Sequence, residues 1–370
     1  MVLVTGEAPE ELVFHSDMRV RTVLQQCAHA LYEAGVGSVA GSDADAQAVA
    51  AHEARVLFAE AFGLTSSDVQ AAVLMDKRVE ELGWAVGAGV GARATEAATS
   101  ARMGESLKFF AEWTGRRARR EPLQHIVGHA PFRYLDLKVG PGVFVPRPET
   151  ELLVDEALEY AKYVRARRAQ EDEGDECDEG VEGAEGAEKA RPLRIVDLCA
   201  GSGALGLAAA TEIPGSEVWA VELSETAYAY TQKNADLVRG AHPDMAMYYE
   251  VIRADATSPD TLKTFDGTVD ILLSNPPYIP QKDIPEQIEA REYDPALALY
   301  GASEDGMKIP AAIIHRASML LRTGGLLLME HDWQQGEATR AVAGECGFEQ
   351  VQTKKDFAGK DRYLYAVKSS

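Results

Sequence analysis

Apolar residues recur at helical spacing through the first third of the chain. Residues 17–35 place five of them on one face of a helix, and Gly35 is suited to end it. The five are Val20, Val23, Leu24, Cys27 and Leu31. Segments 43–64 and 66–83 repeat the pattern, and GLTSSD between them supplies a glycine stop and then Ser and Asp caps. With a further helix over 105–120, these segments predict a small helical domain.

The pattern changes to alternation in the next part of the chain. Residues 125–146 alternate apolar and polar side chains around Gly-Pro-Gly, which predicts a β-hairpin linker. A helix is expected from Pro148 onward, because proline suits a first helical turn. The acids Glu149 and Glu151 favour the positive end of that helix.

Strand and helix patterns alternate from Arg194 onward. Short apolar runs predict buried strands at 194–198, 217–222, 248–252, 269–274 and 325–330. The stretches between them predict helices at 204–212, 225–239 and 311–321. This alternation indicates an α/β fold with a mostly parallel sheet covered on both faces. Two last strands, in 348–356 and 362–368, are expected to form a hairpin at one edge of the sheet.

These patterns divide the chain into three parts. We expect a helical domain over 1–120, a hairpin linker over 121–147 and an α/β domain over 148–370. A Gly/Ala-rich stretch at 86–104 and an acidic tract at 168–191 look like insertions, and the acidic one is low in complexity and not expected to fold.

Charge and composition narrow the kinds of partner. The chain has 370 residues, of which 46% are hydrophobic and 26% charged, as in ordinary soluble proteins. Its net charge is −22; residues 171–190 carry −9 of this and leave −13 for the rest. An acidic surface argues against direct nucleic-acid binding. A basic cluster is either a solvated helix end or a contact for an acidic or RNA-rich partner: Arg116, Arg117, Arg119 and Arg120.

Other sequence signals predict a cytoplasmic chain without a metal site. The N-terminus does not read as a signal peptide, and no apolar stretch is long enough to cross a bilayer. Four cysteines lie far apart without a Cys-x-x-Cys pair, which argues against disulfides and zinc. His125 and His129 are four residues apart, but they fall in strand-like sequence with no third ligand.

A glycine-rich turn joins the first strand of the α/β domain to its helix. Gly201 and Gly203 lie between a buried strand and a helix, where backbone can approach a ligand and free N–H groups can face an anion. The pattern is neither Gly-x-Gly-x-x-Gly nor a phosphate-binding loop with its lysine. A dinucleotide or a nucleoside triphosphate is therefore less favoured.

Acidic residues follow the next two strands. Glu222 ends the second strand about 20 residues after the glycine turn, where an acid binds ribose hydroxyls in nucleotide-binding α/β folds. Asp255 follows the third strand and is suited either to the adenine amino group or to capping a helix.

The fourth strand runs into the sequence Asn-Pro-Pro-Tyr, residues 275–278. The strand ends of an open α/β sheet face one crevice, so this turn should lie beside the glycine turn. The Asn275 side-chain oxygen and the Pro276 carbonyl are suited to accept two hydrogen bonds from one planar –NH2 group. The prolines stiffen the turn, and Tyr278 is suited to pack on a flat substrate.

Together these residues resemble the class I S-adenosylmethionine-dependent methyltransferases, a Rossmann-like fold with a seven-stranded sheet. The Asn-Pro-Pro-Tyr motif marks the branch that methylates planar nitrogens. Four more segments, EPLQHIVGHAPF, VFVPRPETELLVDEAL, YDPALALYGASEDGM and LLLMEHDWQQGEATR, resemble the HemK/PrmC family of peptide chain release factor N5-glutamine methyltransferases. The match runs from about residue 17 to the C-terminus and is weaker in the helical domain.

The resemblance implies an activity and a site. A member of this family transfers the methyl group of S-adenosyl-L-methionine to the glutamine of the GGQ motif in class I release factors, acts in translation termination and leaves S-adenosyl-L-homocysteine. The helical domain would bind the substrate protein, and we expect a monomer. The implied cofactor-binding residues are Asp197, Cys199, Ala200, Gly201, Ser202, Gly203, Glu222, Asp255 and Asn275. The implied catalytic and substrate-binding residues are Asn275, Pro276, Pro277 and Tyr278. Arg147 and Glu149 either line the wall of the substrate pocket or have a purely structural role.

Three positions depart from the family pattern. Cys199 and Ala200 stand where the family often has Gly and Thr, and Asp332 stands where Gly is frequent. Two other functions stay open at this point. One is a DNA or RNA amino-methyltransferase, which would need a basic groove and usually a flipped base. The other is a non-enzymatic cofactor-binding or scaffold protein.

Overall fold

The computed structural model describes residues 12–38, 42–82, 96–174 and 191–369. The chain forms two compact units. One unit comprises Met1–Gly128 together with Glu286–Tyr293, and the other comprises His129–Pro285 together with Asp294–Ser370. The first is helical and the second contains the large sheet, so a short segment from the sheet half of the sequence belongs to the helical unit.

The helical unit contains six α-helices and one 3-10 helix within its described residues. They are α1 (Val20–Glu33), α2 (Asp43–Phe62), α3 (Ser66–Leu74), η1 (Val79–Glu81), α4 (Glu96–Ala118), α5 (Leu123–Val127) and α10 (Ile288–Tyr293). The five predicted apolar positions of α1 are all buried. Gly63, at φ +62°, ends α2, and Thr65 forms a capping box with Asp68 at the start of α3. These boundaries confirm the glycine stop and the part of Asp68 in the cap, whereas the expected serine cap was wrong, because Thr65 caps α3 and Ser66 is its first residue.

Two expectations in this unit were wrong in part. Of the helix expected over 66–83, the described residues 66–82 form α3 and the short η1, because Asp76 adopts φ +54° and interrupts the helix. The insertion expected at 86–104 is helical from Glu96 onward, since α4 begins there. The part of that stretch before Glu96 lies outside the described residues.

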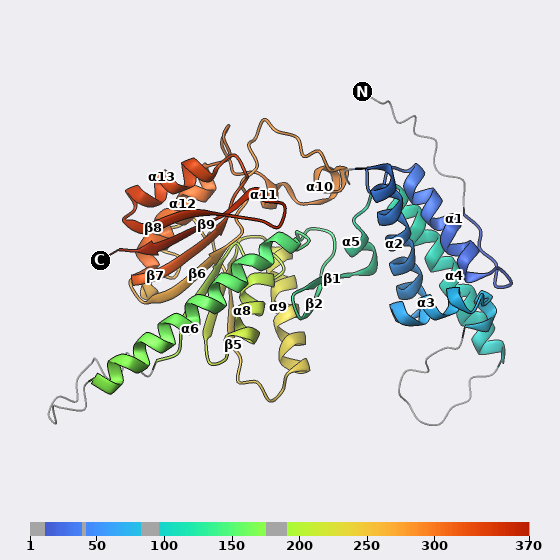
Figure 1. The fold of residues 1–370 in the computed structure, drawn as a ribbon, viewed down its shortest axis with the longest axis horizontal. Coiled ribbons are helices and arrows are strands. Elements are labelled where there is room, and N and C mark those ends of the chain that lie inside the picture. Colours follow the sequence, from blue (N-terminus) through green and yellow to red (C-terminus); the bar gives the residue numbers. More distant parts are fainter. Residues whose placement is uncertain (1–11, 39–41, 83–95, 175–190, 370) are drawn as a thin grey trace. The chain divides into compact units, whose positions relative to one another are not determined.

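The second unit contains a seven-stranded sheet in the order β5-β4-β3-β6-β7-β9-β8 (Figure 1). Its strands are β3 (Arg194–Leu198), β4 (Glu217–Glu222), β5 (Tyr248–Arg253), β6 (Val269–Ser274), β7 (Leu321–Glu330), β8 (Phe348–Lys355) and β9 (Asp361–Lys368). The first five are parallel, and β9 pairs antiparallel with both β7 and β8. The α/β prediction and the terminal hairpin are confirmed.

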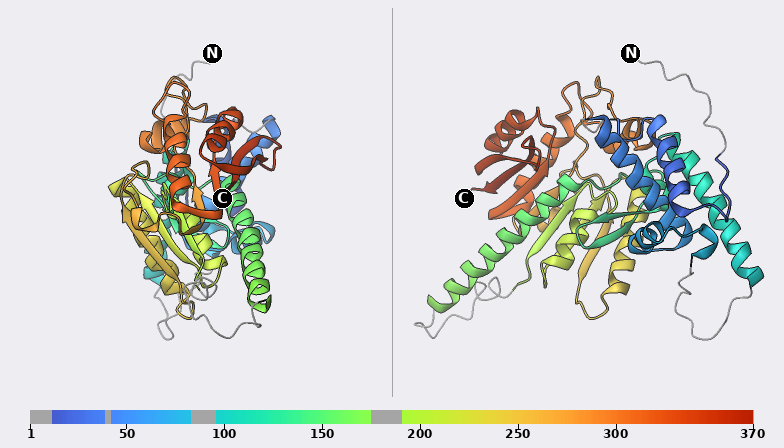
Figure 2. Two further views of the ribbon diagram at one scale, coloured as in Figure 1. Left: turned by 90° about the vertical axis from the view of Figure 1, so that its left-hand side faces the viewer. Right: turned by 45° about the vertical axis from the view of Figure 1, so that its right-hand side comes forward.

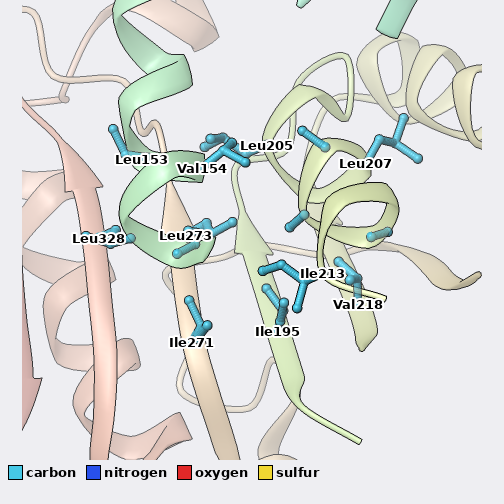
Figure 3. Close-up of a cluster of buried hydrophobic side chains, with 14 of the residues drawn as sticks. Leu153, Val154, Ile195, Leu205, Leu207, Ile213, Val218, Ile271, Leu273 and Leu328 are labelled. Carbon is cyan, nitrogen blue, oxygen red and sulfur yellow. The ribbon is translucent and has the colours of Figure 1, made fainter. Parts of the chain in front are cut away.

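Helices cover both faces of this sheet. One core packs α6 (Glu151–Gly174), α8 (Ala204–Glu212) and α9 (Glu225–Ala241) on one face, and Figure 3 shows Leu153 and Val154 of α6 near Leu273 of β6. The other core packs α12 (Lys308–Leu320) and α13 (Gly336–Glu345) on the opposite face. Both faces are apolar, which explains why the strands read as continuous apolar runs.

The hairpin and the acidic tract differ from expectation in detail. The hairpin pairs β1 (His129–Phe132) with β2 (Leu135–Lys138), so its turn is at residues 133–134 and not at Gly-Pro-Gly. The expected insertion at 168–191 is helical at its start, because α6 continues to Gly174 and extends beyond the strands (Figure 2). Arg168 in α6 and Arg191 both donate to the carboxylate of Asp270, at 2.8 and 2.7 Å, which anchors both sides of the insertion.

Candidate functional site

The predicted site residues of the sheet unit follow the carboxyl ends of neighbouring parallel strands. The glycine turn follows β3, Glu222 ends β4, Asp255 follows β5 and Asn275 follows β6. Parallel strands bring these ends to one edge of the sheet, where α/β folds bind ligands. The topology therefore places the four motifs on the same edge.

The turn after β3 has left-handed backbone at three positions. Cys199, Gly201 and Gly203 have φ values of +67°, +61° and +86°. A side chain at Gly203 would approach Thr231 Cγ2 to 2.9 Å, whereas a side chain at Gly201 would meet nothing within 4 Å. Open space beside Gly201 is what a ligand lying against the turn requires. Since φ at Cys199 also favours glycine, the family's frequent glycine there has a backbone cause.

Asp197 faces the inside of the protein. Its side chain is 1% exposed, and Oδ2 accepts the Gly206 N–H of α8 at 2.9 Å. Oδ1 is buried and has no hydrogen-bond partner among the described residues. Burial raises the pKa of Asp197 to about 7, although the Gly206 bond opposes this. Asp197 thus holds the start of α8 against β3, and its direct contact with a cofactor stays a prediction.

Glu222 fixes the glycine turn to the end of β4. Its carboxylate accepts the N–H of Gly201 at 2.8 Å and that of Ser224 at 2.7 Å. Burial raises its pKa despite these two bonds. Each carboxylate oxygen keeps a further lone pair for a hydroxyl donor. The next residue, Leu223, is 48% exposed at this edge; it is an apolar surface that the sequence reasoning missed.

The remaining predicted cofactor residues contribute in different ways. Ala200 and Ser202 are buried. The Ser202 carbonyl accepts from Asn234 Nδ2 at 2.9 Å, which fixes the turn from behind. Asp255 is exposed, and its Oδ1 accepts from the N–H and the hydroxyl of Thr257 at 2.8 and 2.6 Å. The local cap at Asp255 is therefore present, and its other oxygen faces no described hydrogen-bond donor.

The Asn-Pro-Pro-Tyr turn is held by two residues that sequence reasoning did not select. Asn275 Nδ2 donates to Thr150 Oγ1 at 3.2 Å, and Tyr278 donates its hydroxyl to Glu330 Oε1 at 2.9 Å. Thr150 in turn donates to Glu330 Oε2 at 2.6 Å. Thr150 ends η2 (Pro148–Thr150) and Glu330 ends β7. Both lie inside the family-like segments PRPETE and LLLMEH, which were the available signal.

A loop further along the chain supports the same turn from behind. Ile279 donates its N–H to the carbonyl of Leu299, the last residue of α11 (Ala296–Leu299), at 2.8 Å. Gln335 Nε2 donates to the carbonyls of Tyr278 and Asp305, both at 2.9 Å. Gly306 packs so tightly that a Cβ there would lie 2.1 Å from the Tyr278 oxygen. Residues from segments 293–307 and 326–340 thus support the Asn-Pro-Pro-Tyr turn.

Arg147 and Glu149 occupy the strand-to-helix connection before α6. Arg147 donates to Asp294 at 3.0 Å and lies 4.9 Å from the ring centre of Phe144. Glu149 is half-buried within η2. Asp332 accepts the Gln334 N–H at 2.9 Å, a turn contact that glycine could not make. The structure gives Arg147 a packing role, and its part in substrate binding stays a prediction.

The edge of the sheet suits a sulfonium nucleoside with an amino-acid tail. Gly201 is open on its Cα side, Glu222 retains lone pairs for ribose hydroxyls, and exposed Leu223 offers an apolar surface for a base. Among the described residues, no three or more His, Cys, Asp or Glu side chains gather as metal ligands do. In the same part of the chain, no helix has both the length and the apolar character to span a bilayer.

Comparisons with known proteins bear on the family of this chain. A family model described as methyltransferase small domain matches residues 185–294. The release factor glutamine methyltransferase of Bifidobacterium longum is 44% identical over 95% of this chain and 100% of its own length. That of Streptomyces coelicolor is 41% identical over 70% of this chain and 80% of its own.

A more distant solved structure has also been matched. It is the Thermus thermophilus 16S rRNA N2 G1207 methyltransferase (RsmC) in complex with AdoMet and guanosine, at 21% identity and TM-score 0.39. The match covers 65% of this chain and 49% of that one. The close relatives decide the family. On the strength of the near-complete match to the Bifidobacterium protein, this chain belongs to the release factor glutamine methyltransferases.

Proposed function

We propose that this protein transfers the methyl group of S-adenosyl-L-methionine to the side-chain amide nitrogen of the glutamine in the GGQ motif of class I peptide chain release factors. The named relatives support the substrate class. One observation in the site carries the chemistry: Asn275 is anchored through its Nδ2 atom, so its Oδ1 atom stays available as an acceptor.

The cofactor is assigned to the turn between β3 and α8. Open space beside Gly201 lets the cofactor lie against the turn, Gly203 supplies the left-handed residue before α8, and N–H groups at the start of α8 favour the cofactor carboxylate. Glu222 would accept from the ribose hydroxyls, and Asp255, which follows the next strand, would accept from the amino group of the base. When bound, S-adenosylmethionine supplies an electrophilic methyl carbon on a sulfonium centre.

The substrate amide is assigned to the Asn-Pro-Pro-Tyr turn. Its two N–H groups would donate to Asn275 Oδ1 and to the Pro276 carbonyl. No described group donates a hydrogen bond to that carbonyl. Pro276 and Pro277 are buried and fix the turn, and Tyr278 is held through its hydroxyl. Such a pair of acceptors matches the two N–H donors of a planar –NH2 group, whereas a hydroxyl could donate to only one of them.

Catalysis then rests on orientation. An amide nitrogen is a weak nucleophile because its lone pair is delocalised. Bound S-adenosylmethionine would give its methyl group to this nitrogen and keep the carbon–sulfur electron pair on sulfur, and the nitrogen would release one proton to water. Positive charge developing on the nitrogen strengthens its bonds to Asn275 Oδ1 and the Pro276 carbonyl. Fixed alignment can contribute up to about 7–11 kcal/mol.

The helical unit is assigned to binding the release factor. The predicted catalytic and cofactor-binding residues all belong to the other unit, which supports this assignment. A basic groove for nucleic acid has no support either, since Arg117 and Arg120 are buried in ion pairs.

The proposal is tested by comparing substrates directly. The purified protein is incubated with radiolabelled S-adenosylmethionine and, separately, with a class I release factor, duplex DNA and RNA. Label is expected in the release factor and absent when its GGQ glutamine is replaced by alanine. Label in DNA or RNA alone would assign the site to nucleic-acid methylation, and label in none would favour a non-enzymatic role.

A further inference from the structure

The carboxylate of Glu330 lies buried behind the Asn-Pro-Pro-Tyr turn. Its side chain is 1% exposed and both of its oxygens accept hydroxyl hydrogens, one from Thr150 and one from Tyr278. It reaches these partners from the end of β7, the strand beside β6. A buried acid is costly unless its oxygens are satisfied, so this arrangement needs an explanation beyond packing.

The hydrogen bonds have only one consistent direction. A carboxylate can only accept, so Thr150 must give its single hydroxyl hydrogen to Glu330 Oε2. The Thr150 oxygen then retains only lone pairs toward Asn275, and it can bond the amide only through Nδ2. If the amide were reversed, Asn275 Oδ1 would face the Thr150 oxygen, and neither atom would have a hydrogen to donate to the other. The chain from Glu330 through Thr150 thus decides which end of the Asn275 amide points outward.

We propose that Thr150 and Glu330 are positioning residues for methyl transfer: they orient the Asn275 amide so that its oxygen faces the substrate nitrogen. The inference rests on the proposed function, because it explains how that site obtains its acceptor. It adds two residues from segments 180 positions apart in the sequence. Glu330 is not the base, since both of its oxygens are occupied behind the turn.

The charges around Glu330 predict how pH acts on this arrangement. Burial raises the pKa of Glu330, and the nearby Glu149 of η2 raises it further. The two hydroxyl bonds and the nearby Arg362 of β9 lower it, but burial has the larger effect. Other neighbours in the chain are His331, whose pKa is lowered by burial, and Asp332. On protonation, Glu330 gains a hydrogen that it can donate to Thr150. The Thr150 hydroxyl is then free to donate to Asn275, and the amide orientation is no longer fixed.

The test uses paired substitutions in the full-length protein. Thr150→Val removes the hydroxyl at nearly constant shape, and Thr150→Ser restores it. Thr211→Val is the matched control, because Thr211 bonds only carbonyls of its own helix, α8. For each variant we would measure kcat and KM for the release factor, cofactor affinity by calorimetry, and unfolding by urea. The pH dependence of kcat would be compared between the wild type and Glu330→Gln.

Thr150→Val is expected to lower kcat roughly 10- to 100-fold, as misorientation by a supporting group does, with cofactor affinity kept. Thr150→Ser should recover most of the loss, and Thr211→Val should match the wild type. In the wild type, kcat should fall as the pH is lowered. Glu330→Gln should have a lower kcat than the wild type at neutral pH, and its kcat should not fall further in acid. Wild-type kcat in folded Thr150→Val would overturn the inference, as would an effect on KM alone. If Asn275→Ala is itself fully active, the proposed function fails rather than the positioning of its amide.

Discussion

Glu289 of α10 offers a demanding test of how the helical unit is held together. Its carboxylate accepts from Arg117 at 2.9 Å and from Arg120 at 2.8 Å through both Nε and Nη2. Arg117 is 5% exposed and also bonds Glu53. The basic cluster, for which a solvated helix end was one expectation, is thus partly buried, and that expectation was wrong for two of its four arginines.

Replacing Glu289 by Gln keeps the shape and removes the charge. Breaking a buried ion pair costs about 3–5 kcal/mol, and we expect about 2–3 because Glu289 is 16% exposed and Arg117 keeps Glu53. Glu292→Gln is the control on the same helix, since Glu292 is 56% exposed and, among the described residues, has an ion pair with Arg291 alone. Its cost should be about 0.5 kcal/mol or less.

The assay is native-state hydrogen exchange with mass spectrometry on the full chain. Peptides from α2 and α4 report the opening of the helical unit, and a loss of about 2–3 kcal/mol corresponds to exchange about 30- to 160-fold faster. Burial alone would raise the pKa of Glu289, but its bonds to Arg120 and Arg117 lower it. Its contribution is therefore present above the ordinary glutamate pKa and is lost as pH falls through the lowered one. Equal exchange in Glu289→Gln and Glu292→Gln at neutral pH would refute this reasoning.

Three shorter predictions concern the sheet unit. Gly306→Ala should lower the rate of methyl transfer about tenfold or more, because the added Cβ would push on the Tyr278 carbonyl. Gly359 has a similar φ but open surroundings, so Gly359→Ala should leave the rate unchanged in the same assay. Cys199→Gly should be about 1 kcal/mol more stable to urea than Cys199→Ala, because φ at this position is +67°; equal stability would contradict the strain. Burial raises the pKa of Asp197 to about 7, so the wild type should lose stability relative to Asp197→Asn as the pH rises from the ordinary aspartate range to 7. Above pH 7 the stability difference should stay constant. If urea titrations give the same difference at every pH, the raised pKa is refuted.

Local patterns predicted the elements that carry the chemistry. The strands at 194–198, 217–222 and 269–274 match β3, β4 and β6, because each is a short apolar run bounded by turn residues. The Asn-Pro-Pro-Tyr turn stood out for the same reason, since prolines after an apolar run are locally unusual. Periodicity and turn chemistry depend on neighbours in sequence, so one sequence suffices to read them.

Contacts between distant residues could not be read in this way. Thr150 and Glu330 appear in sequence as an ordinary helix-entry residue and a strand end, and only the fold brings their oxygens to 2.6 Å. Likewise, the sequence gives no sign that Arg120 meets Glu289 far along the chain. The start of α4 at Glu96 was missed because glycine and alanine before it concealed the helix boundary.

The central claim is that Asn275 presents an acceptor to a glutamine amide of a release factor. It is tested most directly by mass spectrometry of the release factor peptide that contains the GGQ motif, after incubation with S-adenosylmethionine and either wild-type protein or Asn275→Ala. We predict one methyl group on the glutamine side chain with the wild type. With Asn275→Ala we expect a large loss of turnover while cofactor binding is kept. Methylation of that glutamine at the wild-type rate by Asn275→Ala, or methylation of another residue by the wild type, would contradict the account.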